Sequence, residues 1–587
     1  MLHFLCESKI RFAIHLDTNM STKQIIECVP NISEGRDQKK IDAIASIVET
    51  VDGVMLLNVD PGKATNRTVI TFAGEPEAVI EAAFLLIKKA SELIDMSVHS
   101  GEHPRFGATD VCPLVPVSNI TMEETITYAH RLGERVGSEL GISGYFYENA
   151  ARTKTRKNLA AVRSGEYEGL QKKLSNPDWK PDFGPDTFND SVKRTGATAI
   201  SARDFLVAYN INLNTTSTRR ANAIAFDIRE RGRVKREGNP LTGKIVKDEN
   251  GNPVNIPGML KAVKGIGWYI EEYGIAQISY NLTNISITSI HKAFDATCER
   301  AQARGLRVTG SELIGLVPKS ALLDAGNHFL KKQERSLGVS EEEIMKIAVK
   351  TLGLDELAPF NPRERVIEYV LEDRMKESGG SLIDLTLTEF ANETAAESPA
   401  PGGGSISAYV GALGVSLGGM VANLSAHKRG WDDKWEYYSG WAEKAQAYKT
   451  QLLNLVDEDT RAFTEIMNAF GLPKSTEQEI AARTSAIIAA TKSATLVPYK
   501  VMEVSFNSME VMLEMAKTGL PASISDAGVG AMCARTAIRG AHLNVRINVK
   551  DLDAPEFVSD VLQKAQTIEQ KTEELEREIL DLVDKQL

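Results

Sequence analysis

The sequence of 587 residues is too long for a single hydrophobic core, so about three or four domains are expected. With 42% hydrophobic residues, 25% charged residues and a net charge of -11, it has the composition of a globular protein, and no basic half or tail indicates a nucleic-acid binder. Its five cysteines are scattered and show no C-x-x-C spacing, a pattern that fits reduced thiols in the cytoplasm better than disulfides or a zinc site.

The first residues do not have the pattern of a signal peptide. Their apolar stretch is interrupted by Glu7, Lys9, Arg11 and Asp17, whereas a signal peptide needs an uninterrupted apolar segment. The stretch Met-Ser-Thr-Lys from Met20 resembles a more natural start. We predict that residues 1–20 are a disordered extension or an artefact of an upstream start codon.

From residue 24 the pattern alternates between strands and helices. Apolar runs and helical spacings predict, in chain order, elements over 24–29, 37–50, 53–59, 68–73, 75–94 and 111–117. A capping box from Thr121 to Glu124 begins a further helix. Because no G-x-G-x-x-G follows the first strand, an α/β sandwich is expected and not a dinucleotide-binding fold.

Two polar residues, Asp60 and Arg67, flank the turn between the second and third predicted strands. Asp60 stands before a Pro-Gly pair, where an aspartate is most often a turn or cap residue. The planar guanidinium of Arg67 suits a substrate carboxylate. A surface ion pair explains Arg67 equally well.

A polar loop over residues 95–110 contains two histidines, His99 and His103, and its Gly101 and Pro104 prevent regular structure. His103 is the predicted acid–base residue, because a histidine can take and return a proton near neutral pH. A structural histidine bonded to the backbone is the alternative. The same glycine and proline disfavour a metal pair, which needs both histidines on one helical face.

The next segments lead into a second α/β unit. The basic residues of 151–173 predict a helix that is either solvated or a partner for a polyanionic substrate tail. Proline, glycine and aspartate predict a loop over 179–196. The second unit begins at residue 197 and contains an inserted hairpin at 236–260. A cleft between two similar halves commonly binds a two-part substrate.

From residue 382 the pattern is almost wholly helical. Residues 406–424 carry no charge over a length near that of a membrane span, but their glycines and the missing basic flank favour a buried bundle helix. The preceding glycine run at 402–404 is either a flexible joint or, as we favour, a close approach of helix N–H groups to a ligand.

Two aspartates, Asp457 and Asp459, lie on a later predicted helix. Their spacing of two places them on different faces, so one can be buried while the other is solvated. Burial raises the pKa of a carboxyl group and suits it to acid–base work. A plainly exposed acidic helix is the alternative. An apolar stripe over 555–587 predicts a helix of about 45 Å that suits a bundle or dimer interface.

Five short motifs resemble those of one family. They are Val-Pro-Asn-Ile-Ser-Glu-Gly at 29–35, Thr-Asn-Arg-Thr-Val at 65–69, Gly-Glu-His-Pro-Arg at 101–105 with Gly-Ala-Thr-Asp-Val-Cys-Pro at 107–113, Ala-Pro-Gly-Gly-Gly-Ser at 400–405 and Val-Asp-Glu-Asp-Thr-Arg-Ala-Phe at 456–463. The first three resemble glutamate formimidoyltransferases, and the last two resemble the cyclodeaminase partner domain. Over about residues 22–587 the chain resembles the formimidoyltransferase-cyclodeaminase family.

The resemblance implies roles for particular residues. It makes His103 the acid–base residue of transfer, Asp459 the proton shuttle of ring closure and Asp60 a further active-site carboxylate. Implied substrate or folate contacts are Arg67, Arg105, Gly184, Pro185, Asp186, Thr187, Phe188, Gly196, Gly402, Gly403, Gly404 and Ser405. No metal ligand is implied.

The implied activity belongs to histidine degradation. A formimidoyl group would pass from N-formimidoyl-L-glutamate to N5 of tetrahydrofolate, which is the co-substrate with or without a polyglutamyl tail. The product would then close to 5,10-methenyltetrahydrofolate with loss of ammonia. The alternatives are a cyclohydrolase-like second domain, or an interaction protein with degenerate sites. We expect a cytoplasmic enzyme that self-associates as a dimer or larger oligomer, without nucleic-acid or membrane partners.

The expected fold is an α/β transferase module of two sandwich-like subdomains followed by an all-α helical bundle. We place the subdomains at 21–196 and 197–330, a helical linker at 331–380 and the bundle at 381–587.

Overall fold

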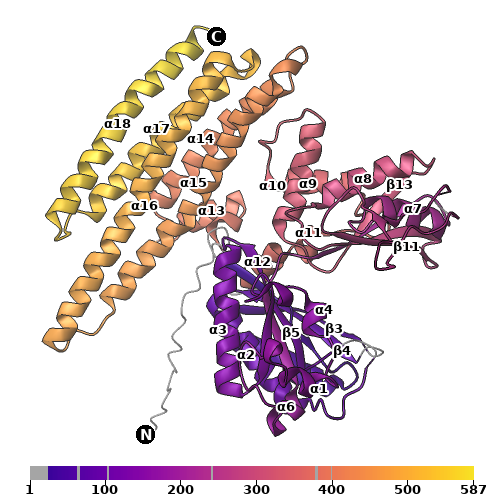
Figure 1. Ribbon diagram of the computed structural model, residues 1–587. Coiled ribbons are helices and arrows are strands. Elements are labelled where there is room, and N and C mark those ends of the chain that lie inside the picture. Colours follow the sequence, from indigo (N-terminus) through magenta and orange to yellow (C-terminus); the bar gives the residue numbers. More distant parts are fainter. Residues whose placement is uncertain (1–23, 63–65, 102–104, 240–241, 377–380, 398–399) are drawn as a thin grey trace, which may run out of the picture. The chain divides into compact units, whose positions relative to one another are not determined.

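The computed structural model describes residues 24–62, 66–101, 105–239, 242–376, 381–397 and 400–587 (Figure 1). The predicted extension at residues 1–20 lies outside these. The chain divides into two compact units, Met1–Ala321 with Leu352–Met375 and Leu322–Thr351 with Lys376–Leu587. Two α/β sheets in the first unit and a helical second unit confirm the predicted fold class.

The first unit begins with a mixed sheet whose described strands follow the order β1-β4-β2-β5-β7-β6, with β3 paired to β4. Strands β5, β7 and β6 run parallel and the other pairs are antiparallel. The strands are β1 (Ile25–Cys28), β2 (Asn31–Ile32), β3 (Val54–Gly62), β4 (Arg67–Gly74), β5 (Thr109–Ser118), β6 (Ser143–Glu148) and β7 (Ala197–Ala202).

Neighbouring residues of a strand point to opposite sides of the sheet. In this sheet the side chains on both sides pack in a hydrophobic core, so both faces are covered. Phe146 of β6 packs in the core shared with α1 (Gln38–Ala45), α2 (Pro76–Leu93) and α3 (Met122–Leu140). Tyr145, one residue earlier, packs in a separate core on short elements after β6. The capping box predicted at the start of α3 is present, with Thr121 and Glu124 bonded reciprocally.

The basic segment 151–173 is not the single helix that its composition predicts. It forms η2 (Lys154–Arg156), α4 (Leu159–Val162) and the start of α5 (Leu170–Leu174). Asn158 begins α4 anew by accepting a hydrogen bond from the Ala160 amide at 2.9 Å, and Gly165, with φ 89°, turns the chain before α5.

The loop predicted over 179–196 also needs correction at its end. After η3 (Pro177–Trp179), the short helix α6 (Asp190–Thr195) forms because the side chain of Asn189 accepts a hydrogen bond from the Val192 amide at 2.9 Å. A cap of this kind satisfies an amide that the first helical turn leaves unpaired.

The second sheet is antiparallel, in the order β11-β12-β8-β13, and is covered by α7 (Thr218–Ile228) and α8 (Ile290–Gln302). Its strands are β8 (Val207–Leu213), β11 (Val263–Ile270), β12 (Ile275–Leu282) and β13 (Val308–Ile314). The insertion predicted at 236–260 projects between α7 and β11, with β9 (Arg233–Val234) paired to β10 (Asn255–Ile256). Its tip turns where Asp248 accepts the amides of Asn250 and Asn252.

Four helices follow the second sheet. They are α9 (Lys319–Lys332), α10 (Glu341–Leu352), α11 (Pro362–Arg365) and α12 (Ile367–Lys376). Leu322–Thr351 belongs to the helical unit, and the chain returns to the first unit over Leu352–Met375.

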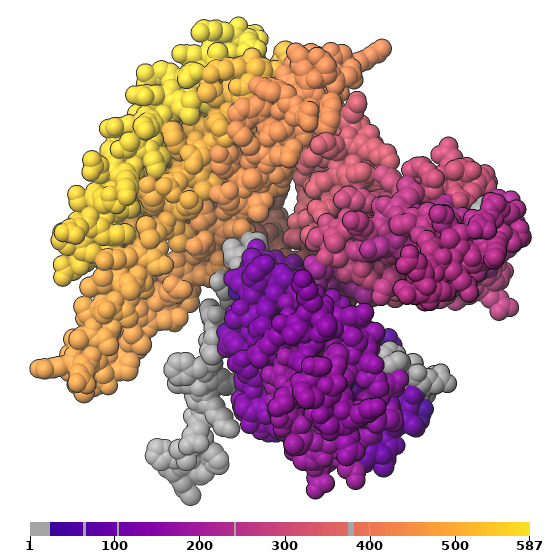
Figure 2. All heavy atoms as spheres, viewed as in Figure 1, coloured from indigo at the N-terminus to yellow at the C-terminus, as the bar shows by residue number. Residues whose placement is uncertain are grey.

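The helical unit is a bundle of long helices around α14, preceded by the short η4 (Leu382–Asp384) and α13 (Leu387–Thr394). Its long helices are α14 (Gly403–Ala426), α15 (Trp435–Phe470), α16 (Glu477–Thr518), α17 (Ile524–Asn548) and α18 (Pro555–Asp584). By length and composition α14 could cross a membrane, and 61% of its apolar window is buried inside the bundle. Helix α18, yellow in Figure 2, packs on α16 and α17 at the edge.

Candidate active sites

The first unit contains a pocket of about 910 Å³ to which both sheets contribute. The first sheet and its loops supply Asn31, Arg67, Val111, Pro113, Tyr147, Glu148, Asn149, Asn158, Leu159, Ala160, Arg163, Ser164, Gly165, Glu166, Arg203 and Asp204. Leu206, Lys264, Thr283 and Asn284 come from the second subdomain. Four cationic and three anionic side chains line it, so the pocket suits an anionic substrate with a polar body.

Arg67 is the predicted binding residue that lines this pocket. Its Nε donates to Oδ1 of Asn31 at 2.9 Å, which fixes the guanidinium from β2. Burial lowers the pKa of Arg67, an effect opposed by the nearby carboxylate of Asp110. A half-buried guanidinium is poorly hydrated, and therefore binds a carboxylate more strongly than a surface arginine does.

Asp110 and Arg163 hold the pocket wall in place. Asp110 is fully buried, and its Oδ2 accepts from Nη2 of Arg163 at 2.6 Å. Its other oxygen accepts the amide of Phe106 at 3.1 Å. This ion pair connects the end of the histidine loop (residues 95–110) to the segment after α4. A buried charge pair therefore fixes the position of the pocket wall.

His103 lies outside the described residues, as do its neighbours at 102 and 104. The described end of the loop is Arg105, which is buried and does not line the pocket. Its guanidinium bonds Glu168 at 2.8 and 3.0 Å, and these bonds raise the pKa of Arg105. A second carboxylate, Glu166, lies 3.4 Å from Arg105 and lines the pocket.

Asp60 is placed apart from the pocket. It is an exposed residue of β3, paired with Val69 of β4, and is not among the lining residues. The strand continues through Pro61 to Gly62, so Asp60 lies within β3 and not in the turn.

The predicted folate-binding residues of 184–196 do not line the pocket either. They are Gly184, Pro185, Asp186, Thr187, Phe188 and Gly196. Phe188 packs on Tyr167, with ring centroids 6.3 Å apart, and the Tyr167 amide donates to the Arg105 carbonyl at 3.0 Å. Gly196, with φ 68°, pairs with Gly107 in an isolated bridge. These two residues therefore support the histidine loop.

The four remaining residues of that segment make local contacts. Gly184, with φ 76°, packs so closely on the backbone of Ile142 that a Cβ there would lie 2.0 Å from the Ile142 carbonyl oxygen. The Pro185 carbonyl accepts from Oγ of Ser143 at 2.5 Å. The exposed Asp186 pairs with Lys180 at 3.7 Å. The Thr187 carbonyl accepts the amide two residues on, at 3.0 Å, in a turn. None of these contacts shows a specific substrate role.

The helical unit brings the glycine run and Asp459 together, although about 55 residues separate them in the chain. Gly402 caps α14, and Gly403, Gly404 and Ser405 form its first turn. Oδ2 of Asp459, on α15, accepts the Ser405 amide at 2.9 Å and the Ser405 hydroxyl at 3.0 Å. The carboxylate therefore lies at the amino end of a long helix, where the helix dipole favours an anion.

Burial raises the pKa of Asp459, and the two bonds from Ser405 oppose the rise. A carboxyl group displaced toward neutral pH can both take up and release a proton. Asp457 points elsewhere, accepting the Leu382 amide at 2.7 Å and the Ser381 hydroxyl. The two aspartates thus bond different segments, as their spacing predicts, but both are half-buried, so the expected contrast between a buried and a solvated aspartate is not seen.

Several residues of these sites were missed by sequence reasoning. Asn31 and Asn66 lie within the family motifs at 29–35 and 65–69, and nothing else in the sequence indicated that they are site residues. Asp110 and Arg163 pair across about 53 residues, which no local pattern indicates. Asn544 of α17 approaches the amino end of α14, with its Nδ2 3.0 Å from where a Cβ of Gly403 would lie.

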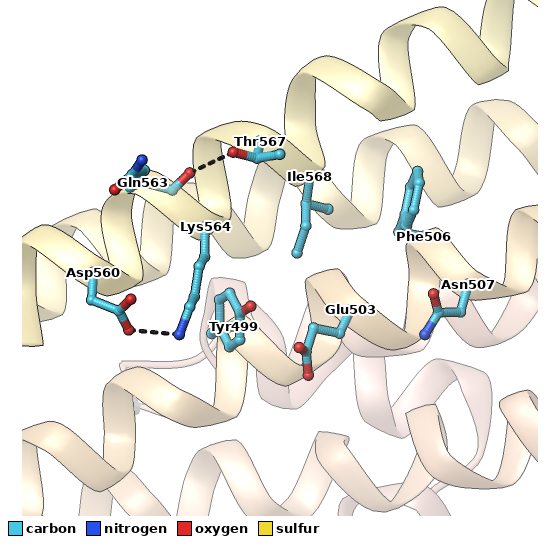
Figure 3. A pocket seen from close by; sticks show the side chains of 9 residues that line it. All are labelled: Tyr499, Glu503, Phe506, Asn507, Asp560, Gln563, Lys564, Thr567 and Ile568. Atoms are coloured by element: carbon cyan, nitrogen blue, oxygen red, sulfur yellow. Dashed lines mark hydrogen bonds and ion pairs between the residues drawn. The ribbon is translucent and has the colours of Figure 1, made fainter.

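A further hollow of about 510 Å³ lies between α16 and α18 (Figure 3). Tyr499 and Phe506 face Ile568 across it, and Lys564 pairs with Asp560 of its own helix at 2.7 Å. None of its lining residues bonds Asp459. Among the described residues, no group of three or more histidine, cysteine or acidic side chains could hold a metal ion.

Family models cover most of the chain. The formiminotransferase domain, N-terminal subdomain, matches residues 25–203, the formiminotransferase domain matches 208–372, and formiminotransferase-cyclodeaminase matches 386–567.

Three curated proteins illustrate the similarity. Formimidoyltransferase-cyclodeaminase of Mus musculus is 42% identical over 551 residues, 93% of this chain and 97% of that protein. Glutamate formimidoyltransferase of Streptococcus pyogenes serotype M1 is 39% identical over 311 residues, 53% of this chain and 95% of that protein. Methenyltetrahydrofolate cyclohydrolase of Methylorubrum extorquens is 35% identical over 179 residues, 30% of this chain and 86% of that protein.

Proposed function

Because this chain belongs to the formimidoyltransferase-cyclodeaminase family, we propose that it catalyses two consecutive steps of folate chemistry. In the first, the formimidoyl group of N-formimidoyl-L-glutamate moves to N5 of tetrahydrofolate and glutamate is released. In the second, 5-formimidoyltetrahydrofolate closes to 5,10-methenyltetrahydrofolate and ammonia is released. Tetrahydrofolate is a co-substrate, with or without a polyglutamyl tail, and the reactions serve histidine degradation.

The transfer step is assigned to the first unit, and the observation that supports it is Arg67 lining a pocket shared by two subdomains. Its guanidinium binds a carboxylate of the glutamate moiety in this proposal. The lone pair of N5 attacks the formimidoyl carbon while the N5 proton passes to His103. The glutamate nitrogen takes that proton as its bond to carbon breaks.

Ring closure is assigned to Asp459 and the amino end of α14. N10 attacks the carbon of the protonated formimidoyl group, and the N10 proton passes to the carboxylate of Asp459. The same proton then goes to the departing nitrogen, which leaves as ammonia, and the product keeps a delocalised positive charge. The raised pKa of Asp459 supports this double role, since one group must accept and donate within a turnover.

One experiment tests both assignments. The protein is mixed with N-formimidoylglutamate and tetrahydrofolate, and the methenyl-folate absorbance band and free ammonia are followed together. Both must rise in equal amounts. Supplying 5-formimidoyltetrahydrofolate directly isolates the second step, because it bypasses transfer.

The second candidate is a cyclohydrolase activity of the helical unit, favoured by the similarity to the methenyltetrahydrofolate cyclohydrolase. Such an enzyme hydrolyses 5,10-methenyltetrahydrofolate, and its absorbance band then disappears without ammonia release. Decay of supplied 5,10-methenyltetrahydrofolate on addition of the protein would favour this candidate over ring closure.

We also propose that the enzyme is cytoplasmic and self-associates through the bundle. Exposed apolar side chains follow one side of α14, at Leu413, Met420 and Leu424, and continue onto α17 at Val529 and Met532. Exposed apolar side chains on two packed helices suit a two-fold contact between copies. Light scattering on the full chain and on Leu424→Glu tests it. A monomeric wild type at micromolar concentration contradicts the proposal.

A further inference from the structure

The other histidine of the loop over residues 95–110, His99, has a bonding pattern that fixes its protonation state. Nε of Arg105 donates to its Nδ1 at 3.3 Å, and its Nε2 lies 3.1 Å from the carbonyl oxygen of Asn66. An arginine is always protonated and only donates, so Nδ1 presents its lone pair. A carbonyl oxygen only accepts, so Nε2 carries the hydrogen. One neutral tautomer satisfies both bonds.

The surroundings of His99 keep this ring neutral. Burial lowers the pKa of His99, and the guanidinium of Arg105 opposes a second positive charge beside it. Arg36 acts in the same direction, while Glu34 and the bond to Asn66 act against it. A ring whose two nitrogens are both engaged has no free position for accepting a substrate proton.

The carbonyl that His99 holds belongs to the peptide bond between Asn66 and Arg67. Asn66 is buried and has φ 49°, a left-handed conformation that asparagine tolerates better than most residues. Its side chain accepts the Gly35 amide at 3.0 Å and donates to the Ser100 carbonyl at 2.9 Å. The peptide that carries Arg67 is therefore held from both sides.

Arg67 leaves this peptide directly into the pocket. Its guanidinium bonds Asn31, and its backbone packs so closely on Gly35 that a Cβ there would lie 2.5 Å from the Arg67 amide nitrogen. A rotation of the 66–67 peptide would move the start of the Arg67 side chain, and the His99 bond opposes that rotation.

We infer that His99 is a positioning residue for the transferase site: its Nε2–H holds the Asn66–Arg67 peptide so that Arg67 presents its guanidinium to the substrate carboxylate, and Arg105 selects the tautomer that can do so. The inference deepens the proposed function, because it rests on Arg67 as the carboxylate-binding residue. His99 acts only through Arg67, so it affects substrate affinity more than turnover.

Two substitutions at this position separate the two bonds of the ring. In His99→Gln the amide nitrogen can occupy the place of Nε2 and keep the bond to Asn66. In His99→Asn the shorter side chain can accept from Arg105 but cannot reach Asn66. The full-length variants are compared by KM for N-formimidoylglutamate, by kcat and by calorimetric binding of L-glutamate.

We expect His99→Asn to raise KM and weaken glutamate binding roughly fivefold, the effect of one lost hydrogen bond, with kcat nearly unchanged. For His99→Gln, both KM and the affinity for glutamate should stay within about twofold of the wild-type values. Ring closure of supplied 5-formimidoyltetrahydrofolate checks that each variant is folded in its second unit. Equal losses in both variants, or a fall in kcat at constant KM, would overturn the inference.

Arg67→Ala separates this inference from the proposed function. If Arg67→Ala binds glutamate as wild type does, the proposed role of Arg67 is wrong whatever His99 does. If Arg67→Ala binds weakly but His99→Asn binds normally, only the His99 inference fails. In the double variant the His99→Asn effect should vanish, because its target side chain is gone.

The tautomer can be read in the wild-type protein, so the inference does not depend on a variant that folds. Imidazole ¹⁵N and ¹³C chemical shifts of labelled histidine distinguish the two neutral forms from the cation, and the signal that His99→Gln lacks identifies His99. An Nε2–H tautomer at pH 7 is expected. An Nδ1–H tautomer, or a cation at that pH, would overturn the inference.

Discussion

The substitution Gly404→Ala tests the ring-closure site most directly. A Cβ at this position would lie 2.1 Å from Oδ1 and 2.5 Å from Cγ of Asp459. Non-bonded heavy atoms prefer about 3.5 Å, so the carboxylate must move by about 1 Å or more. Neither α14 nor α15 can move freely, since both are packed in the bundle core. The carboxylate therefore takes most of the displacement.

The energetic cost follows from the bonds that Asp459 would lose. Its contacts with the amide and hydroxyl of Ser405 measure 2.9 and 3.0 Å. Hydrogen bonds to a charged group are worth about 1.5–3 kcal/mol each. Alanine in place of glycine returns up to about 1 kcal/mol of helix propensity. The net loss of stability is then about 2–5 kcal/mol, if both bonds break.

The catalytic cost should be larger than the structural one. A reacting group misplaced by about 1 Å can lose about 100-fold in rate. We expect Gly404→Ala to reduce ring closure of supplied 5-formimidoyltetrahydrofolate by about that factor, while formimidoyl transfer stays unchanged. The assay follows the methenyl-folate band for closure and glutamate release for transfer.

Gly403→Ala is the matched control. A Cβ there meets Nδ2 of Asn544 at 3.0 Å, the end of a side chain that can rotate away. Both variants add one methyl group to the first turn of α14, so a general effect of alanine would appear in both. If Gly404→Ala closes the ring as fast as Gly403→Ala does, the Asp459 carboxylate is not the acting group.

Three further predictions follow from the titratable groups. Asp459→Asn should abolish ring closure, so that 5-formimidoyltetrahydrofolate accumulates, whereas Asp457→Asn should retain closure; the reverse result, read by chromatography, would exchange their roles. His103→Ala should abolish transfer and leave closure of supplied 5-formimidoyltetrahydrofolate intact, and near-normal glutamate release would refute its assignment. Burial raises the pKa of Glu27 to about 7 despite the nearby Arg203, so the folded state binds its proton more tightly than the unfolded chain. Stability from this group is full below its unfolded pKa of about 4.5 and falls as the pH rises through about 7; Glu27→Gln should flatten that fall in urea unfolding at pH 5 and 7.5.

Short motifs predicted the family, and the comparisons confirm it. They also named Gly404 and Asp459, but their contact arises only from the packing of α14 on α15, which no local pattern specifies. The boundaries of short elements were less predictable. The basic composition of 151–173 suggests a helix, yet one asparagine cap and one left-handed glycine divide it.

The limits of prediction in the transferase site have a different cause. Arg67 could be selected as a carboxylate binder from its side-chain chemistry alone, but its partner Asn31 pairs with it across strands β2 and β4. His99 was considered only as half of a disfavoured metal pair. Its role depends on a backbone carbonyl about 33 residues away, and such side-chain-to-backbone bonds leave no spacing rule in a sequence.

Both sites place a glycine where the functional residue of another segment approaches closely. A Cβ at Gly35 would lie 2.5 Å from the Arg67 amide nitrogen, and one at Gly404 would lie 2.1 Å from the Asp459 carboxylate. In each case the missing side chain leaves a backbone amide accessible to that segment: Asn66, which precedes Arg67, accepts the Gly35 amide, and Asp459 accepts the amide after Gly404. Backbone amides cannot rotate away as side-chain donors can, so they preorganise the site at little entropic cost. A glycine beside a polar residue in a motif can therefore be required because it lets a distant segment approach and bond a backbone amide.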